Sequence, residues 1–384
     1  MHQNYLLVAF MMPLVSVNVS LGDEKVQSPA VATCDFDMKV GMRVIARVGD
    51  APKSLYMCFD TGASHHVFDA RHSDLLKAIA GETNLRTPTN TLKLPLYESA
   101  TIFLDQFATL SKMPVLIMKL DTASEAAGWQ LDGAFSPSQI IASNILEIDF
   151  DSERITIHSK ESSSIYREFE SVPLEVDKVG IPITYPHFVQ FVQPFLVDTG
   201  ASGVSMNADF FDQLVNASQI TETGTVLAST ADSTITRRRG ILRSITLGKY
   251  ELKNVVVIRS TSNYIGLDVL RRFTIAFDLP AGNLYLCPNK RYDQPVSNNT
   301  SGLALGWIHG KVIVVKVDST SPGDQAGICH GDEMLQVNEL PCDGESLGEA
   351  RELLRGARGR TVRIKVRRND EVKQYEFALQ DFVD

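Results

Sequence analysis

The pentapeptide Asp-Thr-Gly-Ala-Ser occurs twice in the chain, at residues 60–64 and 198–202. Each copy follows a short apolar run, residues 55–59 before the first and 195–197 before the second. These runs predict strands that each deliver an aspartate onto a tight turn. Two carboxylates brought close together cannot both stay ionised, so they share a proton. Such a pair could activate a water with one carboxylate and protonate a carbonyl oxygen with the other carboxyl.

Further landmarks recur around the two pentapeptides in the same order. A Lys-Val-Gly tripeptide precedes each aspartate at nearly the same offset, ending at Gly41 and at Gly180. Downstream, alternating apolar residues around a polar turn predict one β-hairpin in residues 145–157 and another in 273–286. Matched landmarks in one order predict a duplicated, mainly β lobe. The two copies are expected at residues 31–160 and 171–290.

A different pattern begins after the polar segment 289–300. Alternating and helical spacings predict a smaller α+β domain over residues 301–384. The expected order is strand, turn with short helix, turn with strand, helix and a closing strand pair, at residues 311–317, 321–327, 331–338, 347–355, 361–367 and 373–379.

The bulk composition bounds the classes of function. The 384 residues are enough for two or three domains. A net charge of −9 gives no electrostatic footprint for nucleic acid. Five widely spaced cysteines without a Cys-x-x-Cys pair support neither a zinc site nor a dense disulfide framework. Pairing of Cys34 with Cys58 in an oxidising compartment stays open.

The N-terminus contains an apolar run over residues 5–17. Its length suits the core of a secretory signal better than a membrane span. Small residues before Asp23 offer a cleavage site, so residues 1–22 are expected to be a signal peptide and the protein to be periplasmic or extracellular. No Lys or Arg precedes the run. An uncleaved anchor or a disordered leader is therefore the alternative.

The doubled Asp-Thr-Gly resembles the active-site motif of the aspartic peptidases, over residues 36–288. The short lobes and the alanine after each glycine resemble the retropepsin-like group, while two lobes in one chain resemble the pepsin-like arrangement. The resemblance implies that Asp60 and Asp198 form the catalytic dyad. It further implies threonines that brace the two turns across the lobe interface and glycines that let substrate backbone approach: Thr61, Thr199, Gly62 and Gly200.

The same family carries a hydrophobic-hydrophobic-Gly element that supports each active-site loop. In the second lobe Tyr264-Ile265-Gly266 resembles this element. In the first lobe Ser136 stands where the glycine falls. A serine fits there if its backbone angles are ordinary, and it strains the loop if a positive φ is required.

The resemblance also implies hairpins, called flaps, that close over substrate. Each flap should lie between the aspartate turn and the support element of its lobe. The expected flap of the second lobe is residues 228–240, and that of the first is 91–100 with Tyr97 as a flap aromatic. The run Arg237–Arg239 is expected to form a solvated face rather than to read substrate.

Residues 321–328 and 331–338 resemble the PDZ domain, in the bacterial form found fused to exported proteases. The resemblance implies a groove that takes an extended peptide as an added strand and captures its terminal carboxylate with backbone amides. The candidate loop is Gly302, Leu303, Ala304 and Leu305. Basic residues from Arg351 to Arg368 could meet acidic partners or lipid, and a solvated surface is the favoured interpretation.

Together these features predict a monomeric, exported aspartic endopeptidase that needs no cofactor and acts on proteins or peptides. No ligand set accompanies His65 and His66, so a metal site is not expected. Ser64 and Ser202 lack a His-Asp partner at a recognisable spacing, so a serine nucleophile is not expected either.

Some relatives place a hydroxyl where Ala63 and Ala201 stand, and its loss disfavours ionised carboxylates. We therefore expect a mildly acidic pH optimum. Two alternatives remain: an exported scaffold that only holds peptides, for which Ser136 is the sequence argument, and a peptidase that processes only its own linker or leader.

Overall fold

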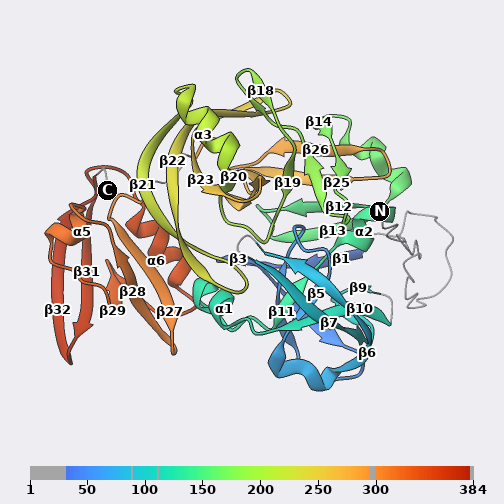
Figure 1. The fold of residues 1–384 in the computed structure, drawn as a ribbon, viewed down its shortest axis with the longest axis horizontal. Helices are drawn as coiled ribbons and strands as arrows, with labels where there is room; N and C mark the ends of the chain where they lie inside the picture. The colour runs from blue at the N-terminus through green and yellow to red at the C-terminus, as the bar shows by residue number, and fades with distance from the viewer. Residues whose placement is uncertain (1–31, 88–89, 110–111, 295–298, 381–384) are drawn as a thin grey trace, which may run out of the picture.

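The computed structural model describes residues 32–87, 90–109, 112–294 and 299–380. The expected signal peptide therefore lies outside the described residues. Within them the strands form four sheets, and the mainly β fold predicted from the sequence is confirmed. Figure 1 shows the two lobes beside each other and the C-terminal domain packed against one side of them.

The first lobe is built on one mixed sheet with the order β6-β7-β10-β5-β11-β4-β3-β8-β9, with β2 paired to β3. Its strands are β2 (Asp37–Lys39), β3 (Gly41–Val48), β4 (Leu55–Phe59), β5 (His66–Asp69), β6 (Leu76–Arg86), β7 (Thr91–Ser99), β8 (Ile102–Leu104), β9 (Phe107–Ala108), β10 (Met113–Met118) and β11 (Gly133–Phe135). The helical segments are η1 (Ala70–Leu75), α1 (Asp121–Ala127) and α2 (Ser138–Ser143).

The second lobe repeats this plan with the order β15-β16-β19-β24-β20-β23-β22-β17-β18, with β21 paired to β22. Its strands are β15 (Glu175–Val176), β16 (Pro182–Thr184), β17 (His187–Phe188), β18 (Phe191–Val192), β19 (Phe195–Val197), β20 (Val204–Asn207), β21 (Ile220–Ser229), β22 (Thr234–Leu247), β23 (Tyr250–Ser260) and β24 (Tyr264–Ile265). The helices are α3 (Ala208–Asn216) and α4 (Leu267–Leu270).

A six-stranded sheet joins the lobes in the order β1-β13-β12-β25-β26-β14. Both predicted hairpins are present in it, as β12 with β13 and β25 with β26. The sequence did not predict that β12 and β25 pair with each other, with Leu146 opposite Phe277. The strands are β1 (Ala32–Asp35), β12 (Asn144–Asp149), β13 (Arg154–Ser159), β14 (Glu170–Pro173), β25 (Phe273–Asp278) and β26 (Asn283–Pro288), and η2 (Lys160–Tyr166) leads from β13 to β14.

One apolar core runs through both lobes and this shared sheet. Phe59 and Phe195, on the strands that end at the two pentapeptides, and Phe135, on the strand that pairs with β4, are fully buried in it. Gly41 and Gly180, the ends of the repeated tripeptide, have φ angles of 97° and 86°. A side chain rarely adopts such angles, so the glycine is needed in both lobes.

The C-terminal domain has its own core and a sheet in the order β27-β28-β29-β31-β32, with β30 paired to β29. The predicted strands, short helix and longer helix are all present. They are β27 (Leu303–Ile308), β28 (Lys311–Val317), α5 (Pro322–Gln325), β29 (Glu333–Val337), β30 (Leu340–Pro341), α6 (Leu347–Leu354), β31 (Thr361–Arg368) and β32 (Glu371–Ala378).

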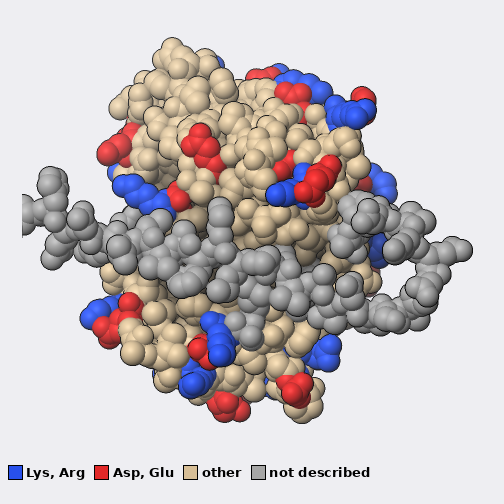
Figure 2. All heavy atoms as spheres, turned by 90° about the vertical axis from the view of Figure 1, so that its right-hand side faces the viewer, with Lys and Arg blue, Asp and Glu red and all other residues tan. Residues whose placement is uncertain are grey.

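The face in Figure 2 carries acidic and basic side chains interspersed, without a broad patch of either sign among the residues described there. All five cysteines are free thiols, so Cys34 and Cys58 are not paired. No helix in the described part of the chain is long and apolar enough to cross a membrane.

Candidate active site

The two aspartates stand at equivalent places in the two lobes. Asp60 follows β4, which pairs in parallel with β11, and Asp198 follows β19, which pairs in parallel with β24. The N–H of Asp60 donates to the carbonyl of Phe135 at 2.9 Å, and that of Asp198 donates to Ile265 at 3.0 Å. Each support strand therefore fixes the backbone of its aspartate with the same hydrogen bond.

The glycines that follow bring the two carboxyl groups face to face. Gly62 donates its N–H to Oδ1 of Asp60 at 2.8 Å, and Gly200 donates to Oδ1 of Asp198 at 2.9 Å. A Cβ on Gly62 would lie 2.5 Å from Cγ of Asp198, and one on Gly200 would lie 2.4 Å from Cγ of Asp60. Each glycine thus leaves room for the carboxyl of the opposite lobe. The role that the resemblance implies, close approach of the substrate backbone, stays a prediction.

The position of the pair changes its acidity. Burial raises the pKa of Asp60, although the N–H of Gly62 partly opposes the shift. Burial, together with the negative charge of Asp60, raises the pKa of Asp198 well above its ordinary value. Two such groups titrate as a pair and hold one proton between them over a range of pH. The arrangement can therefore offer a proton donor and a proton acceptor to the same bound molecule.

Two buried threonines connect the turns across the lobe interface. The hydroxyl of Thr61 donates to the carbonyl of Val197 at 2.6 Å and accepts the N–H of Thr199 at 2.9 Å. The hydroxyl of Thr199 donates to Phe59 at 2.8 Å and accepts the N–H of Thr61 at 3.1 Å. Four hydrogen bonds without access to water therefore fix one turn against the other.

Thr61→Val is expected to lower the free energy of unfolding by about 2 kcal/mol or more, because it leaves a buried N–H and a buried carbonyl without partners. Thr61→Ser keeps the hydroxyl and should cost less than about 1 kcal/mol. Urea unfolding of both variants and of Thr199→Val measures the effect. Because the two threonines share one network, the double valine variant should lose less than the sum of the single losses. Simple additivity would contradict a shared network.

Ser136 occupies the position that Gly266 has in the second lobe, because Phe135 and Ile265 make equivalent pairings. Its φ angle is not positive, so the serine is unstrained. In the second lobe the N–H of Leu267 donates to the carbonyl of Ala201 at 2.9 Å. The first lobe has Pro137 in place of that leucine, and proline has no N–H.

The hydroxyl of Ser136 supplies the missing donor, with a 2.5 Å hydrogen bond to the carbonyl of Ala63. The serine thus compensates for Pro137 and gives no reason to regard the first lobe as defective. Gly266 cannot be replaced in the same way, since a Cβ there would lie 2.5 Å from the carbonyl oxygens of Ala201 and Gly203.

His66 has a structural role in this support. Its Nδ1 accepts the N–H of Ser136 at 3.1 Å, and its ring packs on Phe135 with centroids 4.6 Å apart. Burial lowers the pKa of His66 to about 3, so the ring is neutral and can accept at Nδ1. In the described part of the chain no cluster of His, Cys, Asp and Glu could hold a metal ion.

Two long hairpins contribute residues to a cavity that Asp60 and Asp198 also line. The hairpin of the second lobe is formed by β21 and β22 and contains the expected flap, residues 228–240. The hairpin of the first lobe is formed by β6 and β7, of which the expected segment 91–100 covers only the second strand. Tyr97 packs against the core cluster and is absent from the cavity lining, so its expected role as the flap aromatic is wrong.

The two hairpins meet at their tips. The side-chain N–H of Asn90 donates to Oδ2 of Asp232 at 2.8 Å. Ala231, beside that contact, packs against a buried apolar cluster of the first lobe that includes Leu116 and Trp129. The tips therefore bridge the cleft between the lobes.

The arginine run on β22 divides between two faces. Arg238 pairs with Glu222 and Asp212 and is solvated, as expected. Arg237 and Arg239 instead line the cavity whose walls also contain the two aspartates, so the expectation of a wholly solvated run is wrong for them. Alternation along a strand sends adjacent side chains to opposite faces, which is the physical reason for the division.

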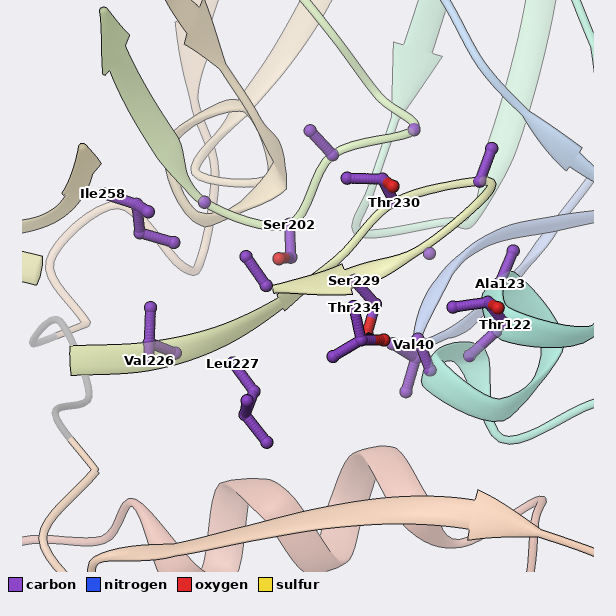
Figure 3. Close-up of a pocket in the computed structure, with 18 of the residues that line it drawn as sticks. Val40, Thr122, Ala123, Ser202, Val226, Leu227, Ser229, Thr230, Thr234 and Ile258 are labelled. Carbon is purple, nitrogen blue, oxygen red and sulfur yellow. Dashed lines mark hydrogen bonds between the residues drawn. The ribbon is translucent and has the colours of Figure 1, made fainter. Parts of the chain in front are cut away.

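A cavity of about 1200 Å³ contains both aspartates in its lining. Its walls also include residues of the second-lobe hairpin, of α1, and of β27 and α6 of the C-terminal domain. Figure 3 shows the hairpin passing between the active-site turns and the C-terminal domain, with Ser202 on one side of it and Leu227 pointing to the other. The C-terminal domain is thus part of the wall of the catalytic cavity, which the sequence did not predict.

The candidate loop of the C-terminal domain lies at the start of β27. Leu303, Ala304 and Leu305 are on that strand and line the cavity, while Gly302 precedes it. The N–H of Gly302 donates to the side chain of Asn299 at 3.1 Å, and the N–H of Leu303 donates to the hydroxyl of Ser301 at 3.2 Å. Two amides of the loop therefore already have partners, and their capture of a carboxylate stays a prediction.

Comparison with known proteins gives matches in two regions. Residues 190–269 match a family described as aspartyl protease, and residues 313–368 match the PDZ domain. Over 93 residues the chain is 28% identical to the carboxy-terminal processing protease CtpB of Bacillus subtilis (strain 168). That alignment covers 24% of this chain and 19% of the relative, so the chain spans about a fifth of the relative's length. The matches show a retropepsin-like aspartyl-protease domain followed by a PDZ domain.

Proposed function

We propose that the protein is an aspartic-type endopeptidase in which Asp60 and Asp198 hydrolyse peptide bonds by general acid–base catalysis. The observation that carries the proposal is the pair of equivalent turns, whose carboxyls face each other in one cavity. The ionised carboxylate takes a proton from a bound water, which then attacks the carbonyl carbon of the substrate. The protonated carboxyl donates to the carbonyl oxygen, so no covalent intermediate with the enzyme forms.

An extended peptide is the substrate that the cavity supports best. The cavity is lined mainly by apolar side chains such as Val226, Leu227 and Ile258, and both hairpins contribute residues to its walls. Apolar walls with a few polar groups are typical of sites that bind and orient a ligand. Both lobes come from one chain, so we propose that the monomer is active. We also propose that it acts after export, with processing of the leader before Asp23 as the direct test.

The proposal is tested with an unbiased peptide mixture, digested by the full chain and by its Asp198→Asn variant. Cleavage by the parent that the variant lacks would support the proposal, and the cut sites would give the subsite preferences. If neither protein cleaves added peptides but the precursor shortens in cis, the enzyme processes only itself. If neither occurs, the peptidase lobes serve as a binding scaffold and the proposal is wrong.

The pH dependence of cleavage should be bell-shaped, because one carboxyl of the pair must be ionised and the other protonated. Burial raises the pKa of both aspartates. The carboxyl that acts as the general acid therefore stays protonated as the pH rises from strongly to mildly acidic. Activity should therefore be maximal at mildly acidic pH and fall as the pH drops below the first pKa of the pair. Measurement of kcat/KM from strong acid to neutrality checks this, and a maximum in strong acid would contradict it.

A further inference from the structure

The second-lobe hairpin extends beyond its sheet. Strand β22 pairs with β23 from Leu247 back to Arg239, and among the described strands the earlier part of β22 pairs with β21 alone. Residues 225–238 therefore form a two-stranded ribbon outside the sheet. Two strands by themselves have marginal stability in water, so the direction of the ribbon depends on what holds its base.

A β-bulge lies at the base of this ribbon. The register of β21 against β22 shifts between Glu222 and Gly224, and Gly224, with a φ of 108°, lies opposite Arg239. A bulge bends its strand and increases the local twist. The ribbon therefore changes direction at Gly224, Thr225 and Arg239, which we call the flap base.

The C-terminal domain contacts the flap base through Lys316 of β28. Nζ of Lys316 donates to Oγ1 of Thr225 at 2.9 Å and to the carbonyl of Thr225 at 3.2 Å. Lys316 is the cross-strand partner of Ala304, which lines the cavity of the dyad. In Figure 1 β21 runs along the side of the second lobe that faces the C-terminal domain. One lysine thus binds both the main chain and the side chain of the hairpin directly beyond its bulge.

Asp318, directly after β28, strengthens the same contact. Its side chain is only 3% exposed, and it forms ion pairs with Lys316 of its own domain and, at 3.8 Å, with Arg239 of the flap base. A carboxylate taken out of water needs cations close to it. One of the two cations here comes from the peptidase lobe, so the charge of Asp318 is compensated only while the domain and the flap base stay together.

The far end of the ribbon is held less firmly. The hydrogen bond between Asn90 and Asp232 at the tips is exposed to water, whereas the bond from Lys316 to Thr225 is partly buried. Because the tips bridge the cleft, they must separate before a continuous peptide can lie across the dyad. The flap base is then the part of the ribbon that keeps its contacts.

We propose that Lys316 and Asp318 are positioning residues for peptide cleavage, because through the flap base they set the direction of the second-lobe flap over the dyad. The inference rests on the proposed function in taking this hairpin to close over substrate. Ala228 and Ile235, further along the ribbon, line the cavity, and an error in direction at the base grows toward them. Loss of the contact should therefore weaken substrate binding more than it slows the chemical step.

Lys316→Met keeps the apolar stem and removes the bonds to Thr225. With a peptide found in the mixture digest, KM should rise about three- to tenfold, as the loss of one net hydrogen bond would give, while kcat stays within about twofold. Lys316→Arg keeps a donor and the charge and should recover most of the change. An unchanged KM in Lys316→Met, or a KM that falls, would overturn the positioning role.

The matched control is Lys311→Met. It removes the same charge from the other end of β28, where Lys311 pairs with Glu333 at 2.9 Å on the exposed side of the domain. Both kinetic constants should stay as in the parent. A rise in KM equal to that of Lys316→Met would show that the contact with the flap base is not the cause.

Thr225→Val tests the contact from the side of the hairpin. It removes one of the two acceptors of Lys316 and should give a smaller rise in KM than Lys316→Met does. Combined with Lys316→Met it should add nothing, because both changes break the same interaction. Additive effects would contradict an action of Lys316 through Thr225.

Hydrogen exchange follows the ribbon without turnover. Amides of residues 225–238 should exchange faster in Lys316→Met than in the parent, and those of β25 and β26 should not. Unchanged exchange in the ribbon, or faster exchange throughout the chain, would overturn the hold on the flap. An inactive parent whose ribbon still responds to Lys316→Met would support that hold and refute the proposed function alone.

Discussion

Asp60→Asn and Asp198→Asn are each expected to lower kcat/KM for peptide cleavage by about 10³-fold, since general acid–base catalysis contributes about 10²–10⁴-fold. Either change leaves one titrating group where the reaction needs two. The substitution is nearly isosteric, so the hydrogen bonds to Asp60 from Gly62 and to Asp198 from Gly200 constrain the same geometry. Steady-state kinetics on a peptide found in the mixture digest measures the loss. Asp50→Asn, at an exposed turn, removes the same charge and should change nothing.

The same variants should be more stable than the parent at neutral pH. The pKa of Asp198 is 3.8 in its ordinary state and is raised in the fold, so the folded protein binds its proton more tightly than the unfolded chain does. The resulting cost to stability is absent below about pH 4 and grows as the pH rises to the folded pKa. Asn removes that cost. Thermal unfolding should therefore show a higher Tm for Asp198→Asn at neutral pH and little difference in acid. An equal gain at both would show that charge burial is not the cause.

Gly266→Ala is expected to lower the free energy of unfolding by at least about 3 kcal/mol, which is the upper end of the range for overpacked cores. The variant should also be inactive. The added Cβ would lie 2.5 Å from two main-chain oxygens, of Ala201 and Gly203, which cannot move without displacing the active-site turn. Denaturant unfolding and the active fraction measure the effect.

The position in the first lobe that is equivalent to Gly266 is Ser136, and a glycine there should destabilise the protein. Ser136→Gly installs the residue typical of the family, yet it should cost about 1–3 kcal/mol, because the carbonyl of Ala63 loses its donor. Adding Pro137→Leu restores a main-chain N–H like that of Leu267 and should recover part of the loss. A stabilising Ser136→Gly, or a double variant no better than the single one, would refute the compensation between Ser136 and Pro137.

The local chemistry of the site could be predicted from the sequence. Two identical pentapeptides after apolar strands indicated the turns, and the matched offsets indicated the duplication. These signals depend on neighbouring residues only, since strand alternation and turn chemistry act over a few positions. The same reasoning locates the support element of the first lobe, but the residue type alone does not show whether Ser136 weakens it. Its role depends on Pro137, one residue away, and became apparent only beside the hydrogen bonds of the second lobe.

Contacts between distant segments could not be predicted in this way. The hairpin tips joined by Asn90 and Asp232, the inward face of Arg237, and the hydrogen bond from Lys316 to Thr225 each depend on how separate elements pack. The prediction that Tyr97 is a flap aromatic is wrong for the same reason. Alternation shows which residues share a face of a strand, but it does not show whether that face packs on the core or lines the cavity. The sequence by itself thus determined two lobes, their aspartate turns and a PDZ domain. The tertiary structure alone decided that the carboxyls share one buried cavity and that the PDZ domain forms part of its wall, because burial and packing are properties of the assembled chain.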